Sequence, residues 1–221
     1  MIEASRVIVD RVTVGPFEEN CYLLVDETIG AAVLVDPGDE GDRIVEMVER
    51  RGVTPSAVWL THAHLDHIGA VSAIRRAWPG IPVALHSADQ LIYARGAQSA
   101  AKYGIPWEQP EPPERELADG DVLTVGDHRV TVWHVPGHAP GHVAFIGAGV
   151  LLAGDCIFAG SVGRTDLPLC DPTAFAQSLD RLLTLPDDTL VHPGHGLPTT
   201  IGKERTTNPF LNGTGRTLGA R

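Results

Sequence analysis

The chain is poor in cysteine and in positive charge. Its three cysteines, Cys21, Cys156 and Cys170, form no CxxC pair among 221 residues, so the sequence does not predict a disulfide framework. Seventeen basic against 28 acidic side chains give a net charge of −11. Because proteins that act on nucleic acids usually carry a basic surplus, we expect no nucleic-acid partner.

Membrane and export signals are also missing from the sequence. No apolar run approaches the roughly 20 residues that cross a bilayer, and we expect no membrane association. The opening residues, Met1 to Arg6, lack the basic and apolar regions of a secretory signal, which favours a cytoplasmic location. With 43% hydrophobic and 20% charged residues, the composition predicts one globular domain over residues 1–221. The oligomeric state is left open.

Apolar runs bounded by glycine and proline alternate with helical patterns along the chain. We expect strands at 6–14, 21–26, 31–36, 57–60, 83–85, 121–124, 129–134, 142–146, 150–153 and 190–191. Helices are expected at 40–51, 68–77 and 173–183. A Pro- and Glu-rich connector, 102–116, is either a solvated surface loop or the join between two halves. This order predicts an α/β fold in which two mixed sheets pack together with helices outside.

The most distinctive motif is the run THAHLDH, residues 61–67. Imidazole and carboxylate groups are good ligands for divalent metal ions, and apolar residues flank the run, which argues against a solvated loop. His62 and His64 point to the same side of an extended segment. Asp66 and His67 follow where the chain turns toward a helix, so they can reach a second, nearby place.

Three later segments each place one more potential ligand at the end of a strand. His138 lies in the turn 136–142, Asp155 follows the apolar strand 150–153, and His195 lies between two glycines. Taken alone, each is as compatible with an ordinary turn or cap residue as with a metal ligand. Together with the histidine run they predict a site for two metal ions.

The ligands divide into two groups with one shared residue. We expect one ion at His62, His64 and His138, and a second at Asp66, His67 and His195, with Asp155 bridging both. Each ion then keeps an open position for water or substrate, as catalytic zinc does. Two metal ions about 3.5–4 Å apart generate a hydroxide nucleophile near neutral pH.

The pattern resembles the signature of the metallo-β-lactamase superfamily, an HxHxDH run followed by separate His, Asp and His positions. The resemblance extends from about Val12 to Leu211. It implies an αβ/βα sandwich with the site at one edge.

Two further segments are similar to glyoxalase II-like proteins. Residues 160–166, GSVGRTD, resemble a segment shared by these hydrolases and by persulfide dioxygenases, and residues 202–211, GKERTTNPFL, resemble the ER-x-x-NPF ending of short bacterial glyoxalase II-like proteins. The helical domain that helps longer glyoxalase II enzymes to bind glutathione has no counterpart in this sequence, so the thiol carrier is open. The resemblance implies a small-molecule substrate, S-D-lactoylglutathione or a related acyl-thiol, hydrolysed by a metal-bound hydroxide. Asp66 and Asp155 would be the catalytic carboxylates, with zinc the first choice of metal and iron or manganese also suited.

Three basic residues are candidates for contact with an anionic thiol carrier: Arg164, Lys203 and Arg205. Each is otherwise an ordinary solvated charge. The alternative function is a mononuclear iron persulfide dioxygenase, with His62, His138 and Asp155 as a two-His-one-carboxylate triad. A non-catalytic binding module would lack one of the ligands, and none is missing.

Overall fold

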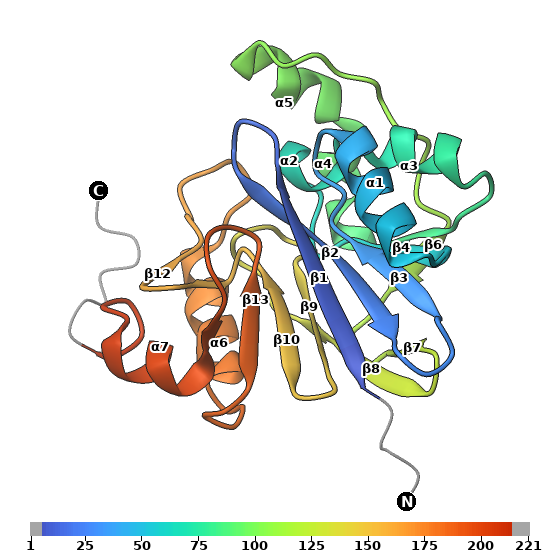
Figure 1. Cartoon of the computed structure of the whole chain (residues 1–221). Helices are drawn as coiled ribbons and strands as arrows, with labels where there is room; N and C mark the ends of the chain where they lie inside the picture. Colours follow the sequence, from blue (N-terminus) through green and yellow to red (C-terminus); the bar gives the residue numbers. More distant parts are fainter. Residues whose placement is uncertain (1–5, 214–221) are drawn as a thin grey trace, which may run out of the picture.

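The computed structural model describes residues 6–213, and most of its strands form two six-stranded sheets (Figure 1). The first sheet has the order β1-β2-β3-β4-β5-β6: β1 (Val7–Val14), β2 (Glu19–Asp26), β3 (Ala32–Val35), β4 (Pro55–Trp59), β5 (Val83–His86) and β6 (Arg115–Leu117). Its first three strands are antiparallel and the other pairings are parallel.

The second sheet has the order β14-β13-β10-β9-β8-β7 and is also mixed, because only β10 and β13 run parallel. Its strands are β7 (Val122–Val125), β8 (His128–His134), β9 (Val143–Gly147), β10 (Val150–Gly154), β13 (Leu190–Pro193) and β14 (Thr199–Thr200). A short hairpin, β11 (Ile157–Phe158) and β12 (Ser161–Val162), stands apart from both sheets.

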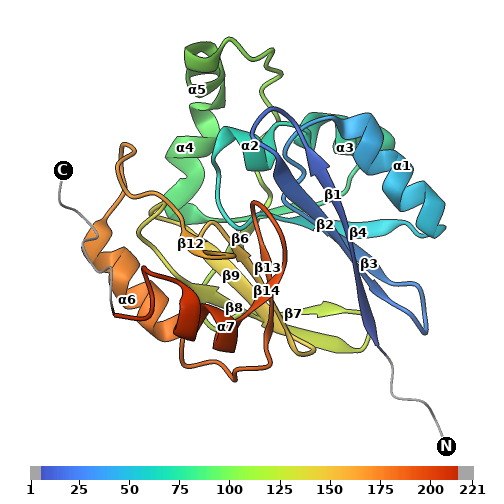
Figure 2. The ribbon, with the colours of Figure 1, turned by 60° about the vertical axis from the view of Figure 1, so that its left-hand side comes forward.

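Helices cover the outer faces of both sheets. The α-helices are α1 (Gly41–Arg51), α2 (Leu65–Ile68), α3 (Val71–Ala77), α4 (Gln90–Ala94), α5 (Gly96–Tyr103), α6 (Pro172–Leu182) and α7 (Ile201–Thr207). Figure 2 shows α1 and α3 on the side of the first sheet and α6 on the side of the second. The predicted αβ/βα sandwich of two mixed sheets is confirmed. No helix among residues 6–213 is long and apolar enough to cross a membrane.

The side chains of β2 point alternately into two apolar layers, one on each face of the first sheet. Tyr22 and Leu24 point between the two sheets, where they belong to one cluster with Phe145 of β9. Leu23 and Val25 point the other way, into the cluster beneath α1 and α3. Successive side chains of a strand face opposite sides of its sheet, so one strand of apolar residues serves two layers.

The structure corrects one expectation from the sequence and decides between two alternatives for another segment. The helix expected at 68–77 begins earlier, as α2 at Leu65, and breaks at Gly69 before α3 begins at Val71, so Asp66 and His67 belong to a helical turn. The connector 102–116 is not the join between the halves, because β6 still pairs with β5 of the first sheet. The chain passes to the second sheet only after Leu117.

Candidate metal centre

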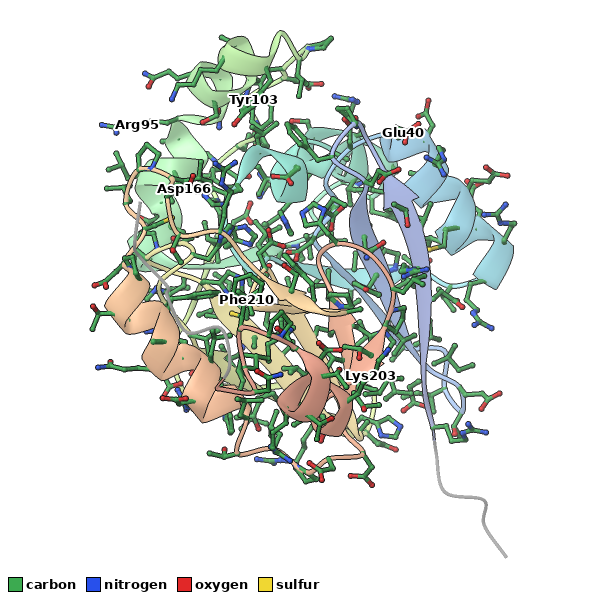
Figure 3. All side chains as sticks on the ribbon, turned by 90° about the vertical axis from the view of Figure 1, so that its left-hand side faces the viewer. Glu40, Arg95, Tyr103, Asp166, Lys203 and Phe210 are labelled. Carbon is green, nitrogen blue, oxygen red and sulfur yellow. The ribbon has the colours of Figure 1, made fainter. Side chains whose placement is uncertain are left out.

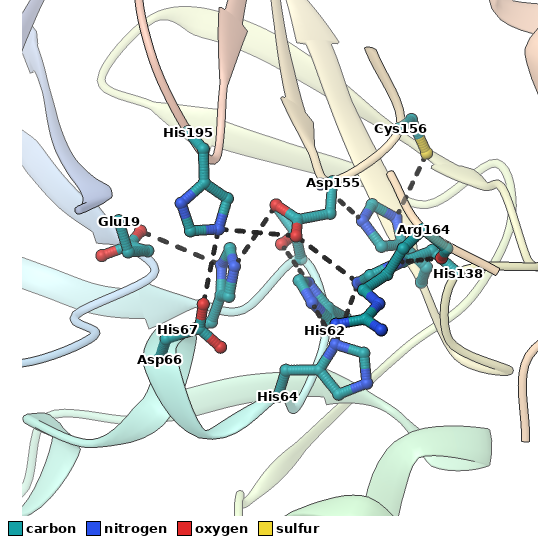
Figure 4. A network of polar contacts seen from close by, with 12 residues as sticks. Glu19, His62, His64, Asp66, His67, His138, Asp155, Cys156, Arg164 and His195 are labelled. Carbon is teal, nitrogen blue, oxygen red and sulfur yellow. Dashed lines mark hydrogen bonds and ion pairs between the residues drawn. The ribbon is translucent and has the colours of Figure 1, made fainter. Parts of the chain in front are cut away.

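The seven predicted ligands lie at the ends of strands on one edge of the sandwich. His62 and His64 follow β4, and the chain then enters α2, which carries Asp66 and His67. The other three follow strands of the second sheet: His138 after β8, Asp155 after β10 and His195 after β13. Figure 4 shows all seven side chains directed toward one another. The structure therefore brings both halves of the chain to one place.

Three imidazole nitrogens converge in the first group. His64 Nδ1 lies 3.0 Å from His62 Nε2 and 2.9 Å from His138 Nε2. Desolvation by burial, followed by the charge of His67, holds the pKa of His62 well below its usual value, so its ring is neutral, which is the form that binds metals.

Hydrogen bonds on the far side of two rings decide which nitrogen faces the centre. His138 Nδ1 donates to the backbone carbonyl of Arg164 over 2.7 Å. His62 Nδ1 lies 3.0 Å from the Thr61 hydroxyl, which itself donates to Asp36 and so accepts from the ring. Nε2 of each ring is then left as an acceptor. Lone pairs that point at one another within about 3 Å suit a cation between them.

The second group consists of one carboxylate and two imidazoles. Ligand atoms of Asp66, His67 and His195 all lie within 4.8 Å of one another, and His195 Nε2 is 3.4 Å from Asp66 Oδ2. His67 Nδ1 contacts Asp36 at 3.1 Å, and His195 Nδ1 donates to the backbone carbonyl of Phe17 over 3.0 Å. Both rings thus turn Nε2 toward the centre, as His62 and His138 do in the first group.

Asp155 lies between the two groups. Its carboxylate oxygens are 3.4 Å from His67 Nε2, 3.4 Å from His138 Nε2 and 3.5 Å from His195 Nε2. Asp155 Oδ1 and His67 Nε2 are buried without a hydrogen-bond partner among the described residues. Buried polar atoms are normally satisfied, and two divalent ions would satisfy both of these. The residues present therefore fit a two-ion centre.

The electrostatics of the site favour cations. Burial alone would lower the pKa of His195, but hydrogen bonds with Asp155 and Asp66 outweigh it and raise the pKa to about 10. Burial would raise the pKa of Asp155, yet the charge of His67 and contacts with His195 bring it well below its usual value. The same carboxylates that stabilise protonated imidazole stabilise a metal ion in its place.

Two aspartates that the sequence analysis did not single out support the ligand loops. Asp36 accepts hydrogen bonds from the backbone and the hydroxyl of Thr61, both over 2.7 Å, besides contacting His67. Asp89 accepts from the backbone of Ala63 over 2.9 Å and of Gly141 over 2.5 Å. Asp89 therefore joins the histidine run to the turn that carries His138. The only local signal for Asp36 was its position at the end of an apolar strand.

Glu19 was also missed by sequence reasoning. Its side chain is 1% exposed, and neither carboxylate oxygen has a hydrogen-bond partner among the described residues. Burial raises the pKa of this carboxyl well above its usual value. One oxygen lies 3.9 Å from His67 Nδ1, on the side of the ring that Asp36 also occupies.

The structure separates the three basic residues that were predicted to bind substrate. Arg164 lines a pocket beside the ligands, and its guanidinium makes two hydrogen bonds with Asp166, of 2.6 and 2.8 Å. Lys203 and Arg205 lie on α7 and do not line that pocket. Arg205 instead donates to backbone carbonyls of residues 183 and 185 and pairs with Asp187.

Comparison with known proteins agrees with this geometry. The family model described as metallo-beta-lactamase superfamily matches residues 14–195. The chain belongs to this superfamily. Among curated relatives, it is 38% identical to the "Probable metallo-hydrolase YqgX" of Bacillus subtilis, over 92% of this chain and 97% of the relative. It is 34% identical to the "Hydroxyacylglutathione hydrolase GloC" of Haemophilus influenzae, over 92% and 98% of the two chains.

Solved structures show the same fold. TTHA1623, described in a di-iron-bound form, superposes with a TM-score of 0.85 at 46% identity, over 92% of this chain and all of that one. The B3 metallo-beta-lactamase BLEG-1 gives 0.87 at 38% identity, over 93% and 100%. ETHE1 from Myxococcus xanthus gives 0.77 at 28% identity, over 96% and 86%. This chain is a metal-dependent hydrolase of the superfamily, with His and Asp clusters that fit two divalent ions.

Proposed function

We propose that the protein hydrolyses thioesters of small acyl-thiols, with S-D-lactoylglutathione as the first substrate to test. The observation that carries this proposal is Asp155 between two complete ligand groups, at one end of a pocket of about 570 Å³. Pockets of this volume suit a small-molecule substrate. The similarity to a hydroxyacylglutathione hydrolase supports the choice of substrate.

The ligands would hold two divalent ions, one at His62, His64 and His138 and the other at Asp66, His67 and His195, with Asp155 touching both. Such a pair of ions lowers the pKa of water and polarises a carbonyl oxygen. Asp66 and Asp155 also line the pocket, so their carboxylates can orient the attacking water and take up its proton.

The reaction needs no separate acid for the leaving group. The water oxygen bonds to the acyl carbon and the carbon–sulfur bond breaks, giving a carboxylic acid and a thiol. Sulfur leaves as a thiolate, which is a stable species because thiol pKa values are about 8.5. Among the pocket residues outside the ligand groups there is no carboxylic acid, which agrees with this chemistry.

Zinc-loaded protein should release free thiol from S-D-lactoylglutathione, and His64→Ala should remove most of that activity while the protein stays folded. A β-lactam offered to the same preparation tests the activity named for BLEG-1. Absence of thiol release from any acyl-glutathione by protein that holds two ions would reject the proposal.

The second candidate is an iron-dependent persulfide dioxygenase, which the similarity to ETHE1 favours. That reaction needs only His62, His138 and Asp155, whereas here the second group is complete as well. Oxygen uptake by iron-loaded protein given glutathione persulfide would select this candidate, and its absence together with thioester hydrolysis would select the first.

A further inference from the structure

The pocket beside the metal centre has walls of one charge. One end of it is formed by five of the predicted ligands: His64, Asp66, His138, Asp155 and His195. Every other charged residue of its lining is basic: Arg95, Lys102 and Arg164. In a chain with 28 acidic and 17 basic side chains, an ordinary stretch of surface would include acidic groups. The pocket walls therefore favour an anionic ligand.

Most of the polar residues that line the pocket, apart from the candidate ligands, lie on one face of a helix. Arg95, Gln98, Ser99, Lys102 and Tyr103 recur at spacings of three and four along α5 and its N-terminal cap, and all five line the pocket. Residues spaced in this way share one side of an α-helix. Figure 3 shows Arg95 and Tyr103 on this segment, on the same side of the molecule as Asp166.

Two of the three cations are not engaged with other residues. Arg164 is neutralised in part by its two hydrogen bonds with Asp166. Within residues 6–213, Arg95 and Lys102 form no ion pair and no side-chain hydrogen bond. Their charges are available to a ligand.

Aromatic and aliphatic residues line the pocket between these cations and the candidate ligands. Phe17 contacts Tyr103 edge to face, with ring centres 5.2 Å apart, and Phe158 contacts His195 in the same way at 5.8 Å. Both phenylalanines line the pocket. A ligand can therefore reach from the metal centre to α5 along an apolar path.

We propose that Arg95 and Lys102 form a subsite for the carboxylates of the thiol carrier, so that the substrate is a thioester of a short anionic peptide thiol. This inference rests on the proposed thioesterase function. The two residues are seven positions apart, or about 10 Å along a helix. An extended tripeptide with a carboxylate at each end has about the same length. The acyl group then lies at the metal centre and the carrier lies along α5.

The test compares two substrates, one with the carboxylates of the carrier charged and one with them esterified. S-D-lactoylglutathione carries the carboxylates, and its dimethyl ester has them masked. The variants are Arg95→Gln, Lys102→Gln and the double variant. Arg50→Gln is the control, since it removes one exposed charge from α1, which does not line the pocket. Each pocket variant should raise KM for the free acid about tenfold, with little change in kcat or in hydrolysis of the ester.

Binding provides a second measurement that does not depend on turnover. S-Methylglutathione is a stable thioether, and calorimetry should show it bound by metal-loaded wild type and by Arg50→Gln, but at least tenfold more weakly by the double variant. Equal binding by wild type and the double variant, or equal loss of activity on acid and ester, would overturn the subsite. Normal binding without hydrolysis of either thioester would instead reject the proposed function and leave the subsite standing.

Discussion

His138 donates its Nδ1 proton to the backbone carbonyl of Arg164, 2.7 Å away. This bond joins the turn after β8 to the segment that follows the β11–β12 hairpin, and it leaves Nε2 of the ring facing the metal centre. The acceptor is main chain, so the orientation of His138 does not depend on the Arg164 side chain. One residue thus supports a candidate metal ligand with its backbone and also lines the pocket beside the candidate ligands.

Because the backbone of Arg164 contacts His138 and its side chain does not, two alanine variants should have different effects. His138→Ala should lower the bound metal from two ions per chain toward one and remove most of the activity, because a ligand of the first group is lost. Arg164→Ala should keep two ions per chain and change mainly KM. Elemental analysis of the purified proteins measures both. Loss of metal from Arg164→Ala would show that the backbone contact depends on the side chain.

Removal of the metal should destabilise the fold. Without cations, Asp66 and Asp155 stand close together in a largely buried site, and convergent imidazoles lose their shared partner. Each ion present at about a hundred times its dissociation constant would stabilise the native state by about 3 kcal/mol. For a chain of this size, the loss of even one such ion lowers the melting temperature by roughly 5–10 °C. Differential scanning calorimetry with and without chelator, followed by zinc addition, checks this; an unchanged melting temperature would contradict it.

The seven candidate ligands could be predicted from sequence because all of them stand in short motifs that follow strands. The residues that orient them could not. Asp36 and Asp89 bind backbone groups at least 25 positions away along the chain, and no local spacing encodes such a partner. Their contacts exist only once β3, β4 and the turn after β8 have come together.

The helices α4, α5 and α7 were not predicted from the sequence. In α5 only Gly96 and Ala100 are buried, so the segment has no apolar stripe to reveal its period.

The ER-x-x-NPF segment has a packing role that its sequence alone does not indicate. Glu204 accepts hydrogen bonds from Gly160 and Asn208, and Asn208 donates to Ser161, which ties α7 to the β11–β12 hairpin beside the pocket.

His192 should make stability depend on acid pH. Burial, and then the charge of Arg11, lower its pKa from 6.5 to about 4, and its Nε2 has no hydrogen-bond partner among the described residues. Between pH 6.5 and pH 4, His192 is protonated in the unfolded chain and neutral in the folded chain. The contribution of His192 is therefore fully present above pH 6.5 and is lost as the pH falls through 4.

His192→Phe keeps a ring against Tyr22, with which His192 makes an edge contact, and removes the titration. The stability of the wild type relative to this variant should fall by about 3 kcal/mol between pH 7 and pH 4. Urea unfolding in the presence of chelator measures the difference without the contribution of bound metal. A difference that stays constant across this range would count against the buried, neutral imidazole.

Gly194 should strengthen metal binding, because its lack of a side chain leaves room for the Asp155 carboxylate. A Cβ atom at this position would lie 2.2 Å from Asp155 Oδ1 and 2.9 Å from His67 Cε1. The backbone cannot easily withdraw, since its N–H donates to Gly154 and its carbonyl accepts from Asn20, each over 2.8 Å. Gly194→Ala must therefore displace the carboxylate that lies between the two ligand groups.

We expect Gly194→Ala to weaken metal binding by about 10- to 100-fold, the range seen when residues that support metal ligands are changed. Gly149→Ala is the matched control: its φ of 79° disfavours alanine, but no atom lies within 4 Å of the added methyl group. The control should lose about 1 kcal/mol of stability and keep its affinity for metal. Titration of both apo variants with zinc separates the effect of backbone strain from that of the methyl group against Asp155. Wild-type zinc affinity in Gly194→Ala would mean that Asp155 can bind the ions from a displaced position.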